Sequence, residues 1–281
     1  MFQVLKKEEL SPHVYAMTIS APRVAKKAQP GQFIVLRVNE EGERIPLTIA
    51  DFDREKGEIL LVFQTIGAST LELAAKNPGD TILDFVGPLG QPSVIGKLDG
   101  TMVVVGGGIG VAPTYPIARA MKEAGNKVIA IMGAKTKDIL IMEEQMKQVT
   151  DEIVVTTDDG SRGIKGFVTN AVEALVARGE KIAQITAIGP CIMMKSVADC
   201  TRPLGIKTVV SLNPIMVDGT GMCGGCRVTV GDETKFACVD GPEFDGHLVD
   251  FKGLMSRQRM YRDLEAIEKD HVCKIGLGAE D

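Results

Sequence analysis

The chain has 281 residues, 44% of them hydrophobic and 25% charged, which is the balance of a globular protein long enough for roughly two domains. This composition excludes intrinsic disorder, collagen-like repeats and a small disulfide scaffold. A formal net charge of −5, no tryptophan and only 4% aromatic residues provide neither the basic face nor the stacking side chains of nucleic-acid-binding proteins. We therefore expect no nucleic-acid partner.

Neither a secretory leader nor a membrane span is predicted. Residues 6–9 are all charged, where the apolar core of a leader would lie. Residues 101–118 carry no charge and reach the length of a membrane span, but they include four glycines and two prolines. A strand, a glycine turn and the start of a helix account for this run better. We expect a cytoplasmic protein without a membrane span.

Residues 1–97 are predicted to form an antiparallel β-barrel. Short runs rich in branched side chains alternate with turn-forming residues, a pattern typical of small barrels. One helical turn, Ser69–Lys76, interrupts the series, and Ser69 or Thr70 is expected to cap it. The predicted strands are residues 32–38, 45–50, 58–63 and 81–86.

Two of these elements carry residues suited to a flavin dinucleotide. The planar fork of Arg44 can clamp a diphosphate, and Thr48 can hydrogen-bond a flavin ring nitrogen. The start of the short helix, at Gly67, Ser69 and Thr70, supplies N–H donors to the same diphosphate. The alternative is that Arg44 is an ordinary solvated surface residue.

Residues 98–213 are predicted to form a Rossmann-like α/β domain, because short apolar runs alternate with helical patterns as in βαβ units on a parallel sheet. The predicted strands are residues 102–105, 128–132, 153–157, 185–188 and 207–212. The predicted helices are residues 114–124, 142–149, 168–178 and 193–201. Such a sheet binds its ligand at the carboxyl ends of its strands.

A glycine turn follows the first strand of this domain and opens a helix; its residues are Gly106, Gly107, Gly108, Ile109 and Gly110. Glycines allow the backbone to approach a phosphate, whose charge a helix N-terminus favours. The turn departs from G-x-G-x-x-G, since Val111 stands at the sixth position. The alternative is a tight strand-to-helix connection without a ligand.

Charged residues after the third strand bear on the choice of nucleotide. Asp158 and Asp159 can accept hydrogen bonds from ribose hydroxyls and would repel a 2′-phosphate. Arg162, Lys135 and Lys137 would instead attract that phosphate. A solvated turn explains the acidic pair equally well.

Residues 214–245 are dense in glycine and cysteine, and residues 246–281 are predicted to be a helical tail. The spacing Asp-x4-Cys-x2-Cys-x11-Cys, formed by Asp218, Cys223, Cys226 and Cys238, resembles that of plant-type [2Fe–2S] ferredoxins with aspartate in the first place. A structural zinc site or buried free thiols are the alternatives. Cys191, Cys200 and Cys273 compete with Asp218 as fourth ligand.

Taken in order, these segments resemble the ferredoxin–NADP reductase superfamily. They are more similar to the electron-transfer subunits of dihydroorotate dehydrogenase, and most similar to the small subunits of NADH-dependent reduced ferredoxin:NADP oxidoreductases, also called sulfide dehydrogenases. Aspartate in place of the first cluster cysteine favours this last group. The matching motifs are Arg-x-Pro-Leu-Thr at 44–48, Gly-Ala-Ser-Thr at 67–70, Gly-Pro-Leu-Gly at 87–90, the glycine turn at 106–113, Asp-Asp-Gly-Ser at 158–161, Gly-Pro at 189–190 and the cysteine loop.

The resemblance implies a multidomain β plus α/β fold: an FAD-binding barrel at 1–97, an NAD(H)-binding domain at 98–213, a [2Fe–2S] domain at 214–245 and a helical tail at 246–281. It places FAD on Arg44, Pro46, Leu47, Thr48, Val62, Phe63, Gln64, Gly67, Ser69 and Thr70. It places NAD(H) on Gly106, Gly107, Gly108, Ile109, Gly110, Asp158, Asp159, Gly189 and Pro190, and the cluster on Asp218 and the three cysteines. Cys191 is interpreted as a packing residue.

The implied function is electron transfer by cofactors, without catalytic side chains. Hydride passes between NAD(H) and FAD, and single electrons pass through the [2Fe–2S] cluster to a larger FAD/[4Fe–4S] subunit of a heterodimer. That partner handles NADP and ferredoxin, and the resemblance implies that the two subunits together bifurcate electrons between ferredoxin and the nicotinamides. The alternatives are the electron-transfer subunit of an NAD-dependent dihydroorotate dehydrogenase and a non-catalytic zinc or redox-responsive binding module.

Overall fold

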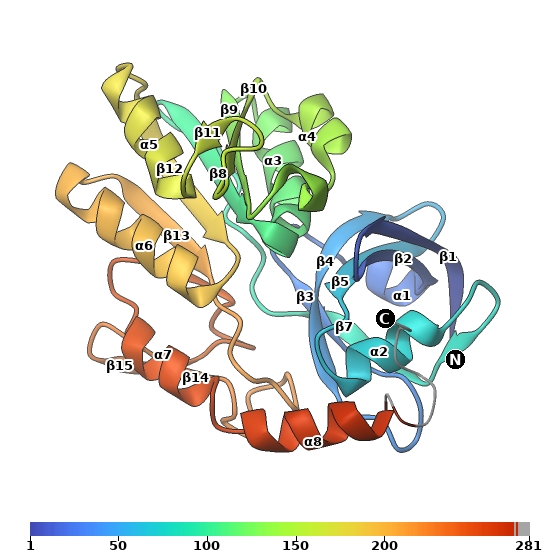
Figure 1. The fold of residues 1–281 in the computed structure, drawn as a ribbon. Helices are drawn as coiled ribbons and strands as arrows, with labels where there is room; N and C mark the ends of the chain where they lie inside the picture. Colours follow the sequence, from blue (N-terminus) through green and yellow to red (C-terminus); the bar gives the residue numbers. More distant parts are fainter. Residues whose placement is uncertain (273, 275–281) are drawn as a thin grey trace.

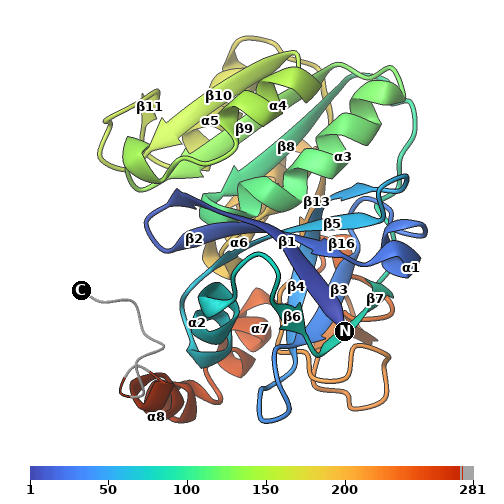
Figure 2. The same cartoon turned by 90° about the vertical axis from the view of Figure 1, so that its right-hand side faces the viewer.

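The computed structural model describes residues 1–272 and 274. Its N-terminal part is an antiparallel sheet with the strand order β6-β1-β2-β5-β4-β3-β7, coiled into a nearly closed barrel (Figures 1 and 2). The strands are β1 (Phe2–Ser11), β2 (Val14–Ser20), β3 (Phe33–Arg37), β4 (Ile45–Asp53), β5 (Glu58–Gln64), β6 (Thr81–Ile82) and β7 (Asp84–Leu89). Two short helices, α1 (Pro22–Ala25) and α2 (Ala68–Ala75), join them.

Alternation of side chains explains the barrel core. In β5, Ile59, Leu61 and Phe63 are all buried at every second position, as expected of a strand with one face inside. The strands β1 and β2 were not predicted, because β1 carries a charged run at 6–9 that hides its alternation. Helix α2 begins at Ala68 after Gly67, so neither Ser69 nor Thr70 is the residue that precedes the helix. Thr70 does contribute to the cap, because its hydroxyl accepts the Gly67 N–H from within the first turn.

The second sheet has the order β11-β10-β9-β8-β12-β13-β16, in which only β16 runs antiparallel to its neighbour. Its strands are β8 (Thr101–Gly107), β9 (Val128–Ala134), β10 (Glu152–Thr157), β11 (Ile164–Lys165), β12 (Ile182–Ile188), β13 (Lys207–Ser211) and β16 (Glu243–Asp245). Its helices are α3 (Val111–Glu123), α4 (Glu143–Val149), α5 (Val168–Ala177) and α6 (Cys191–Thr201), with 3₁₀ turns η1 (Gly108–Gly110), η2 (Lys137–Ile139) and η3 (Arg202–Leu204).

Both faces of this sheet are covered by helices, as Figure 1 shows. Val103 and Val105 of β8 face the layer of α5 and α6, whereas Met102 and Val104 face the layer of α3 and α4. Burial on both faces explains why these strands appear as continuous apolar runs in the sequence. Residues 101–118 are thus strand, glycine turn and helix start, as predicted. None of the described helices is long and apolar enough to cross a membrane.

The C-terminal part follows β13. It contains the hairpin β14 (Arg227–Val230) and β15 (Glu233–Phe236), strand β16, and two helices, α7 (Phe251–Arg257) and α8 (Arg262–Val272). Helix α8 lies beside α2 of the barrel in both ribbon views. A barrel, a parallel-sheet α/β domain and a cysteine-rich segment with a helical tail confirm the predicted fold class. The boundaries at 97, 213 and 245 stay predictions.

Candidate functional site

The hairpin brings two of the predicted cluster ligands together. Cys226 directly precedes β14, and Cys238 is the second residue after β15; the pairing of Arg227 with Phe236 sets their register. Both cysteines are buried, and their Sγ atoms lie 3.2 Å apart. Burial and the neighbouring Cys226 thiol raise the pKa of Cys238 to about 12. Two thiols this close in an apolar setting have the spacing that two ligands of one metal or cluster site would need.

The third cysteine is exposed on the loop that precedes the hairpin, which we call the cluster loop (residues 214–226). The Gly225 N–H donates a hydrogen bond to Cys223 Sγ at 3.4 Å, and this bond is the main cause that lowers the pKa of the Cys223 thiol. Gly224 makes the turn possible with a φ of +67°, in the left-handed region. The backbone here favours a thiolate, the form that binds iron.

Asp218 is half-buried near the start of the loop. Its Oδ2 accepts hydrogen bonds from Thr220 N at 2.9 Å, Thr220 Oγ1 at 2.7 Å and Met222 N at 3.0 Å. These bonds, with a smaller effect of the Arg44 charge, lower the pKa of its carboxyl group. Within residues 1–272 and 274, no three metal-ligating side chains converge. The donor set therefore fits a cluster chemically, while the structure brings together only Cys226 and Cys238.

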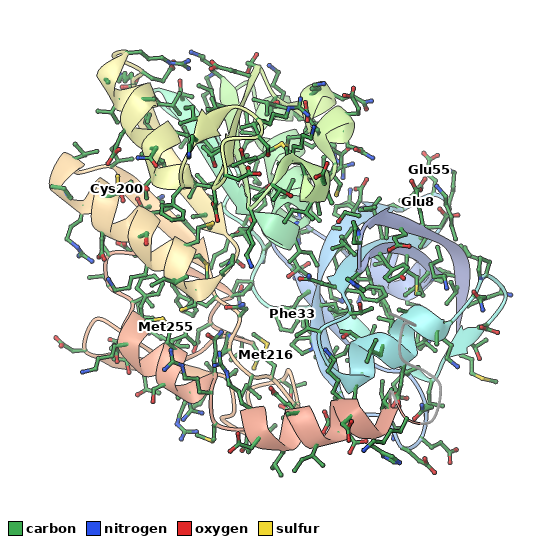
Figure 3. The ribbon with its side chains drawn as sticks, in the orientation of Figure 1. Glu8, Phe33, Glu55, Cys200, Met216 and Met255 are labelled. Atoms are coloured by element: carbon green, nitrogen blue, oxygen red, sulfur yellow. The ribbon has the colours of Figure 1, made fainter. Side chains whose placement is uncertain are left out.

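The competing cysteines lie elsewhere. Cys191 and Cys200 are on α6 and pack in the core of the α/β domain, and burial raises the pKa of Cys191 to about 11. Figure 3 shows Cys200 on that outer helix, well away from Met216 of the cluster loop. Cys273 lies outside the described residues. The interpretation of Cys191 as a packing residue agrees with this environment.

The cluster loop and hairpin are seated on the barrel. A Cβ on Gly219, whose φ is +80°, would lie 3.0 Å from Val35 of β3 and 2.9 Å from Leu89 of β7. Glycine at this position lets the loop approach the barrel closely. Figure 3 shows Phe33 and Met216 at the same junction. The buried residues of the shared apolar cluster are Phe33, Val35, Met216, Cys226, Ala237 and Cys238.

The predicted flavin residues lie on neighbouring barrel elements. Pro46, Leu47 and Thr48 of β4 pair with Val35, Ile34 and Phe33 of β3, the strand under the cluster loop. Arg44 is exposed just before β4 and makes no hydrogen bond or ion pair within the part of the chain that the structure describes. A free guanidinium beside this strand suits a diphosphate.

The other flavin residues are less uniform. On β5, Phe63 faces the barrel interior, Val62 faces the core shared with α3 and Gln64 is exposed, so their side chains do not share one environment. In α2, the Thr70 hydroxyl accepts hydrogen bonds from the N–H groups of Ile66 at 3.0 Å and Gly67 at 3.1 Å. Ala68 and Ser69 follow within the first helical turn, where N–H groups have no intrahelical partner and can bind an anion.

The glycine turn and the Gly-Pro motif meet at the carboxyl ends of β8 and β12. A Cβ on Gly110 would lie 2.1 Å from the Ile188 carbonyl oxygen, and one on Gly189 would lie 3.0 Å from the Gly107 oxygen. A Cβ on Gly108 would meet nothing within 4 Å, although its φ is +55°. Glycines therefore close-pack the two strand ends and leave one face of the turn open to a phosphate.

The acidic turn after β10 is internally bonded. Asp159 Oδ1 accepts from Ser161 N at 2.9 Å and Ser161 Oγ at 2.7 Å, which lowers the pKa of its carboxyl group. Ser161 Oγ in turn accepts from the N–H of Lys137, which follows β9, at 2.9 Å. Asp158 is exposed beside this network. Within the described residues the Asp158 carboxylate makes no hydrogen bond that holds the turn, so it can accept hydrogen bonds from a ribose.

Glu143, the first residue of α4, lies at the same edge of the sheet as the acidic turn and binds Arg162. The sequence did not predict this residue as part of the site. Its Oε1 accepts from Arg162 Nη2 at 2.6 Å, and its side chain is only 15% exposed. Met142 precedes it with a φ of +56°, a left-handed conformation that is uncommon outside glycine. No local motif links residues 143 and 162, so only the folded structure shows their pairing.

Comparison with known proteins decides the family. An iron–sulfur cluster binding domain of dihydroorotate dehydrogenase B matches residues 213–250, and an oxidoreductase NAD-binding domain matches residues 104–199. A Thermotoga maritima homolog of the dihydroorotate dehydrogenase B electron transfer subunit is 50% identical over 99% of this chain and 98% of its own length. The chain belongs to this family of electron-transfer subunits.

Two further relatives place this electron-transfer subunit within the family. The dihydroorotate dehydrogenase B electron transfer subunit of Geobacillus kaustophilus is 35% identical over 84% of this chain and 92% of its own length. A solved structure of an NADH-dependent reduced ferredoxin-NADP oxidoreductase, studied for flavin-based electron bifurcation, matches with a TM-score of 0.92. It is 49% identical and covers 97% of this chain and 98% of that chain.

These matches confirm the predicted oxidoreductase class, the nicotinamide-binding α/β domain and the iron–sulfur segment of the electron-transfer subunit. The match to residues 213–250 ends before α7, so nothing in it assigns a role to the helical tail. The individual ligand residues, including Asp218, stay predictions.

Proposed function

We propose that this electron-transfer subunit moves reducing equivalents between NAD(H) and a larger partner subunit by way of FAD and a [2Fe–2S] cluster. When bound, NAD(H) supplies or accepts hydride, FAD links two-electron to one-electron chemistry, and the cluster carries single electrons. The chain's own residues bind these groups, fix their spacing and exclude water between them.

The observation that carries this proposal is the contact between the cluster loop and the barrel. Gly219 of the loop packs on Val35, and Val35 pairs with Pro46 on the strand of the proposed flavin residues. The Arg44 charge also lowers the pKa of the Asp218 carboxyl group. These contacts support the proposal, because they would make the cluster site and the flavin site neighbours, as electron transfer between them needs.

The glycine turn is proposed to hold the diphosphate of NAD(H), with Gly189 and Pro190 beside it and Asp158 and Asp159 at its adenosine end. Helix α3 begins directly after the turn at Val111, so its N-terminal N–H groups face the same place. Arg119 of α3 donates to Asp51 of β4 at 2.7 Å and fixes this domain against the barrel. This ion pair would hold the proposed nicotinamide and flavin sites at a fixed distance from each other.

The proposed partner is a larger subunit with its own FAD and [4Fe–4S] clusters that handles NADP and ferredoxin in a cytoplasmic heterodimer. Similarity to an NADH-dependent reduced ferredoxin-NADP oxidoreductase over nearly the whole of both chains supports this assignment and electron bifurcation. Aspartate in the first ligand place supports it over the dihydroorotate-dependent branch.

The test is an anaerobic preparation of the full chain. We expect flavin absorption bands with broad additional iron–sulfur absorbance, iron and acid-labile sulfide in equal amounts, and bleaching of both chromophores by NADH. A colourless protein that contains zinc would overturn the proposal in favour of a binding module. Co-purification from native cells should yield the larger flavin and iron–sulfur subunit.

The second candidate is the electron-transfer subunit of an NAD-dependent dihydroorotate dehydrogenase. The relatives that carry that name support it, with 35% identity over 84% of this chain in one case. The complex with the native partner separates the two. Reduction by dihydroorotate would support this second candidate, whereas NADH- and ferredoxin-dependent reduction of NADP would support the first.

A further inference from the structure

The carbonyl groups of both glycines between two of the cluster cysteines accept hydrogen bonds from arginine side chains. Cys223 and Cys226 are separated by Gly224 and Gly225. The Gly224 oxygen accepts from Arg227 Nη1 at 3.0 Å, and the Gly225 oxygen accepts from Arg257 Nη2 at 3.1 Å. Arg227 begins β14 and Arg257 ends α7, so the two side chains reach the same turn from different elements.

The orientation of these peptide groups matters for the sulfur atoms beside them. A carbonyl oxygen that faced a thiolate would repel it, whereas an N–H group stabilises it. With both carbonyls engaged by guanidinium groups, the Gly225 N–H donates to Cys223 Sγ at 3.4 Å. A hydrogen bond to a carbonyl also polarises the N–H of the same peptide group, which for Gly225 belongs to Cys226.

Arg257 is firmly placed. Asp250 caps the start of helix α7, since its Oδ1 accepts from Gly253 N at 3.0 Å, and Phe251 and Leu254 of the helix are buried in the core. The next residue, Gln258, donates from Nε2 to the Asn213 main-chain oxygen at 2.9 Å and to Asn213 Oδ1 at 3.1 Å. The end of α7 therefore binds the chain at two places: at Asn213, just before the cluster loop, and at Gly225, between two of its cysteines.

We infer that Arg227 and Arg257 are positioning residues for the iron–sulfur cluster: they turn the Gly224 and Gly225 carbonyls away from the sulfurs and place positive charge beside the site. This inference rests on the proposed function, because it requires that the loop hold a cluster. Neither arginine is a ligand. Positive charge stabilises the reduced, more negative cluster, so both residues raise its midpoint potential.

The experiment compares Arg257→Gln with Arg259→Gln in the full chain. Arg259 is an exposed arginine two residues away, and no side-chain contact of its guanidinium appears within the described residues, so the control removes the same charge from the same surface. Each variant is titrated anaerobically with spectroelectrochemical detection, and the reduced cluster is examined by electron paramagnetic resonance. FAD and iron contents are measured in parallel.

We expect Arg257→Gln to have a more negative cluster midpoint and an altered resonance line shape, with Arg259→Gln close to the unmodified chain. Arg227→Gln should shift the midpoint in the same direction. Arg257→Lys keeps the positive charge and a hydrogen-bond donor, so its cluster midpoint potential should lie close to that of the unmodified chain. If Arg257→Gln does not fold, the inference requires an unchanged midpoint potential in Arg257→Lys and a more negative one in Arg227→Gln.

Equal midpoints and line shapes in Arg257→Gln and Arg259→Gln would overturn the inference while the proposed function stands. Absence of iron and acid-labile sulfide from the unmodified chain would instead overturn the proposed function, and this inference with it. A lowered midpoint in both variants alike would show a general effect of surface charge and would also contradict a positioning role.

Discussion

Arg162 donates from Nη2 to Glu143 Oε1 at 2.6 Å, across the edge where β10 ends and α4 begins. Arg162 follows the acidic turn at Asp158 and Asp159, where the adenosine ribose of NAD(H) is proposed to lie. A free arginine there would bind a 2′-phosphate, and an arginine paired with a carboxylate binds it less well. The ion pair therefore adds to the acidic turn in favouring NAD(H) over NADP(H).

Glu143→Gln should strengthen NADP(H) binding by about tenfold, because a freed guanidinium can make charge-assisted hydrogen bonds to the 2′-phosphate. NAD(H) affinity should change little. Glu144→Gln is the matched control, since Lys147 pairs with Glu143 at 3.2 Å and with Glu144 at 2.6 Å. Dissociation constants from calorimetric titration provide the measurement. Equal NADP(H) affinities in the two variants would contradict this role for the ion pair.

The fold was largely predictable from the sequence, and the reasons are local. Strands buried on both faces, such as β8 and β9, give continuous apolar runs, and the glycine turn marks the end of β8. Strand β1 escaped prediction because Val4 is its only fully buried apolar residue and charged side chains follow it. Helix α2 was predicted to within one residue at its start, but Gly67 was not predicted as the residue that precedes the helix, and Thr70 bonds the Gly67 N–H from inside the first turn.

The site was predictable only where it follows from spacing along the chain. Cys223 and Cys226 are neighbours in sequence, and their turn needs the glycines between them. Glu143 with Arg162, and Arg257 with Gly225, are contacts between distant segments that carry no shared motif. Asp218 illustrates the limit: spacing makes it a ligand candidate, while its Oδ2 is engaged by Thr220 and Met222 within the loop.

Asp218→Cys tests the fourth ligand. If Asp218 binds iron, the variant should retain a [2Fe–2S] cluster, because cysteine is the usual ligand at this place in plant-type spacing, and its visible and electron paramagnetic resonance spectra should change. Asp232→Cys, an exposed aspartate in the β14–β15 turn, controls for an added surface thiol. Spectra identical to those of the unmodified chain would place the fourth ligand on another residue, with Cys273 next to be substituted.

Glu243 of β16 connects the α/β sheet, through a hydrogen bond from Ser93, to the segment between β7 of the barrel and β8. Its Oε1 accepts from Ser93 Oγ at 2.6 Å, and burial raises the pKa of its carboxyl group despite this bond. A carboxyl group with a raised folded pKa destabilises the fold when ionised, and the penalty disappears as pH falls toward its usual value of 4.5.

Glu243→Gln should therefore raise the urea midpoint of unfolding at pH 7 and leave it unchanged near pH 4.5, because glutamine keeps the acceptor for Ser93 without the charge. Ser93→Ala should destabilise by about 1–3 kcal/mol, since it leaves a buried acceptor unpaired. Glu55→Gln is the control; Figure 3 shows Glu55 at the outer end of the barrel. A lower midpoint for Glu243→Gln than for Glu55→Gln at pH 7 would contradict the prediction.

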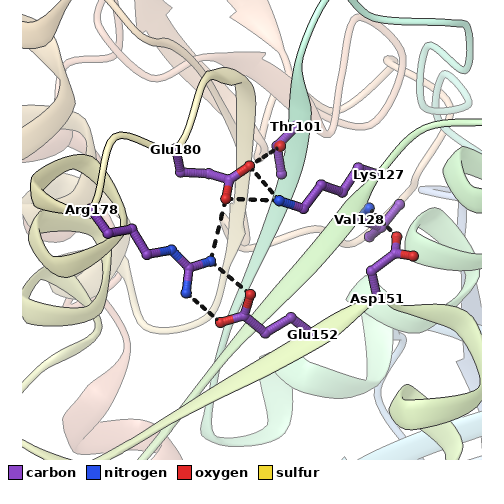
Figure 4. Close-up of polar contacts among 7 residues, drawn as sticks. All are labelled: Thr101, Lys127, Val128, Asp151, Glu152, Arg178 and Glu180. Carbon is purple, nitrogen blue, oxygen red and sulfur yellow. Dashed lines mark hydrogen bonds and ion pairs between the residues drawn. The ribbon is translucent and has the colours of Figure 1, made fainter.

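Glu180 links the amino ends of three strands, at the edge opposite the ligand site (Figure 4). Its two carboxylate oxygens accept from Lys127 Nζ at 2.7 and 2.8 Å, and it also accepts from Thr101 Oγ1 and from Arg178 Nη2, the latter at 3.4 Å. Arg178 is in turn bidentate to Glu152, with both distances 2.7 Å. The Lys127 hydrogen bond, followed by that of Thr101, lowers the pKa of the Glu180 carboxyl group.

Glu180→Gln should destabilise the fold by about 1 kcal/mol at pH 7, because the partly exposed Lys127 limits what the ion pair contributes. A carboxyl group with a lowered folded pKa stabilises the fold above its usual value of 4.5 and loses this contribution as pH falls through the folded pKa. The difference between Glu180→Gln and the unmodified chain should therefore shrink below pH 4.5. Urea unfolding of both chains at pH 7 and below pH 4.5 measures this difference in the free energy of unfolding.

Nucleotide binding should be unaffected by Glu180→Gln, because the cofactor site proposed for NAD(H) lies at the carboxyl ends of the same strands. Glu123→Gln, an exposed residue at the end of α3, is the control for loss of a surface carboxylate. Equal unfolding midpoints in the two variants would show that the network in Figure 4 contributes no stability beyond that of a solvated side chain. A loss of NADH affinity in Glu180→Gln alone would instead show that this edge of the sheet is coupled to the nucleotide site.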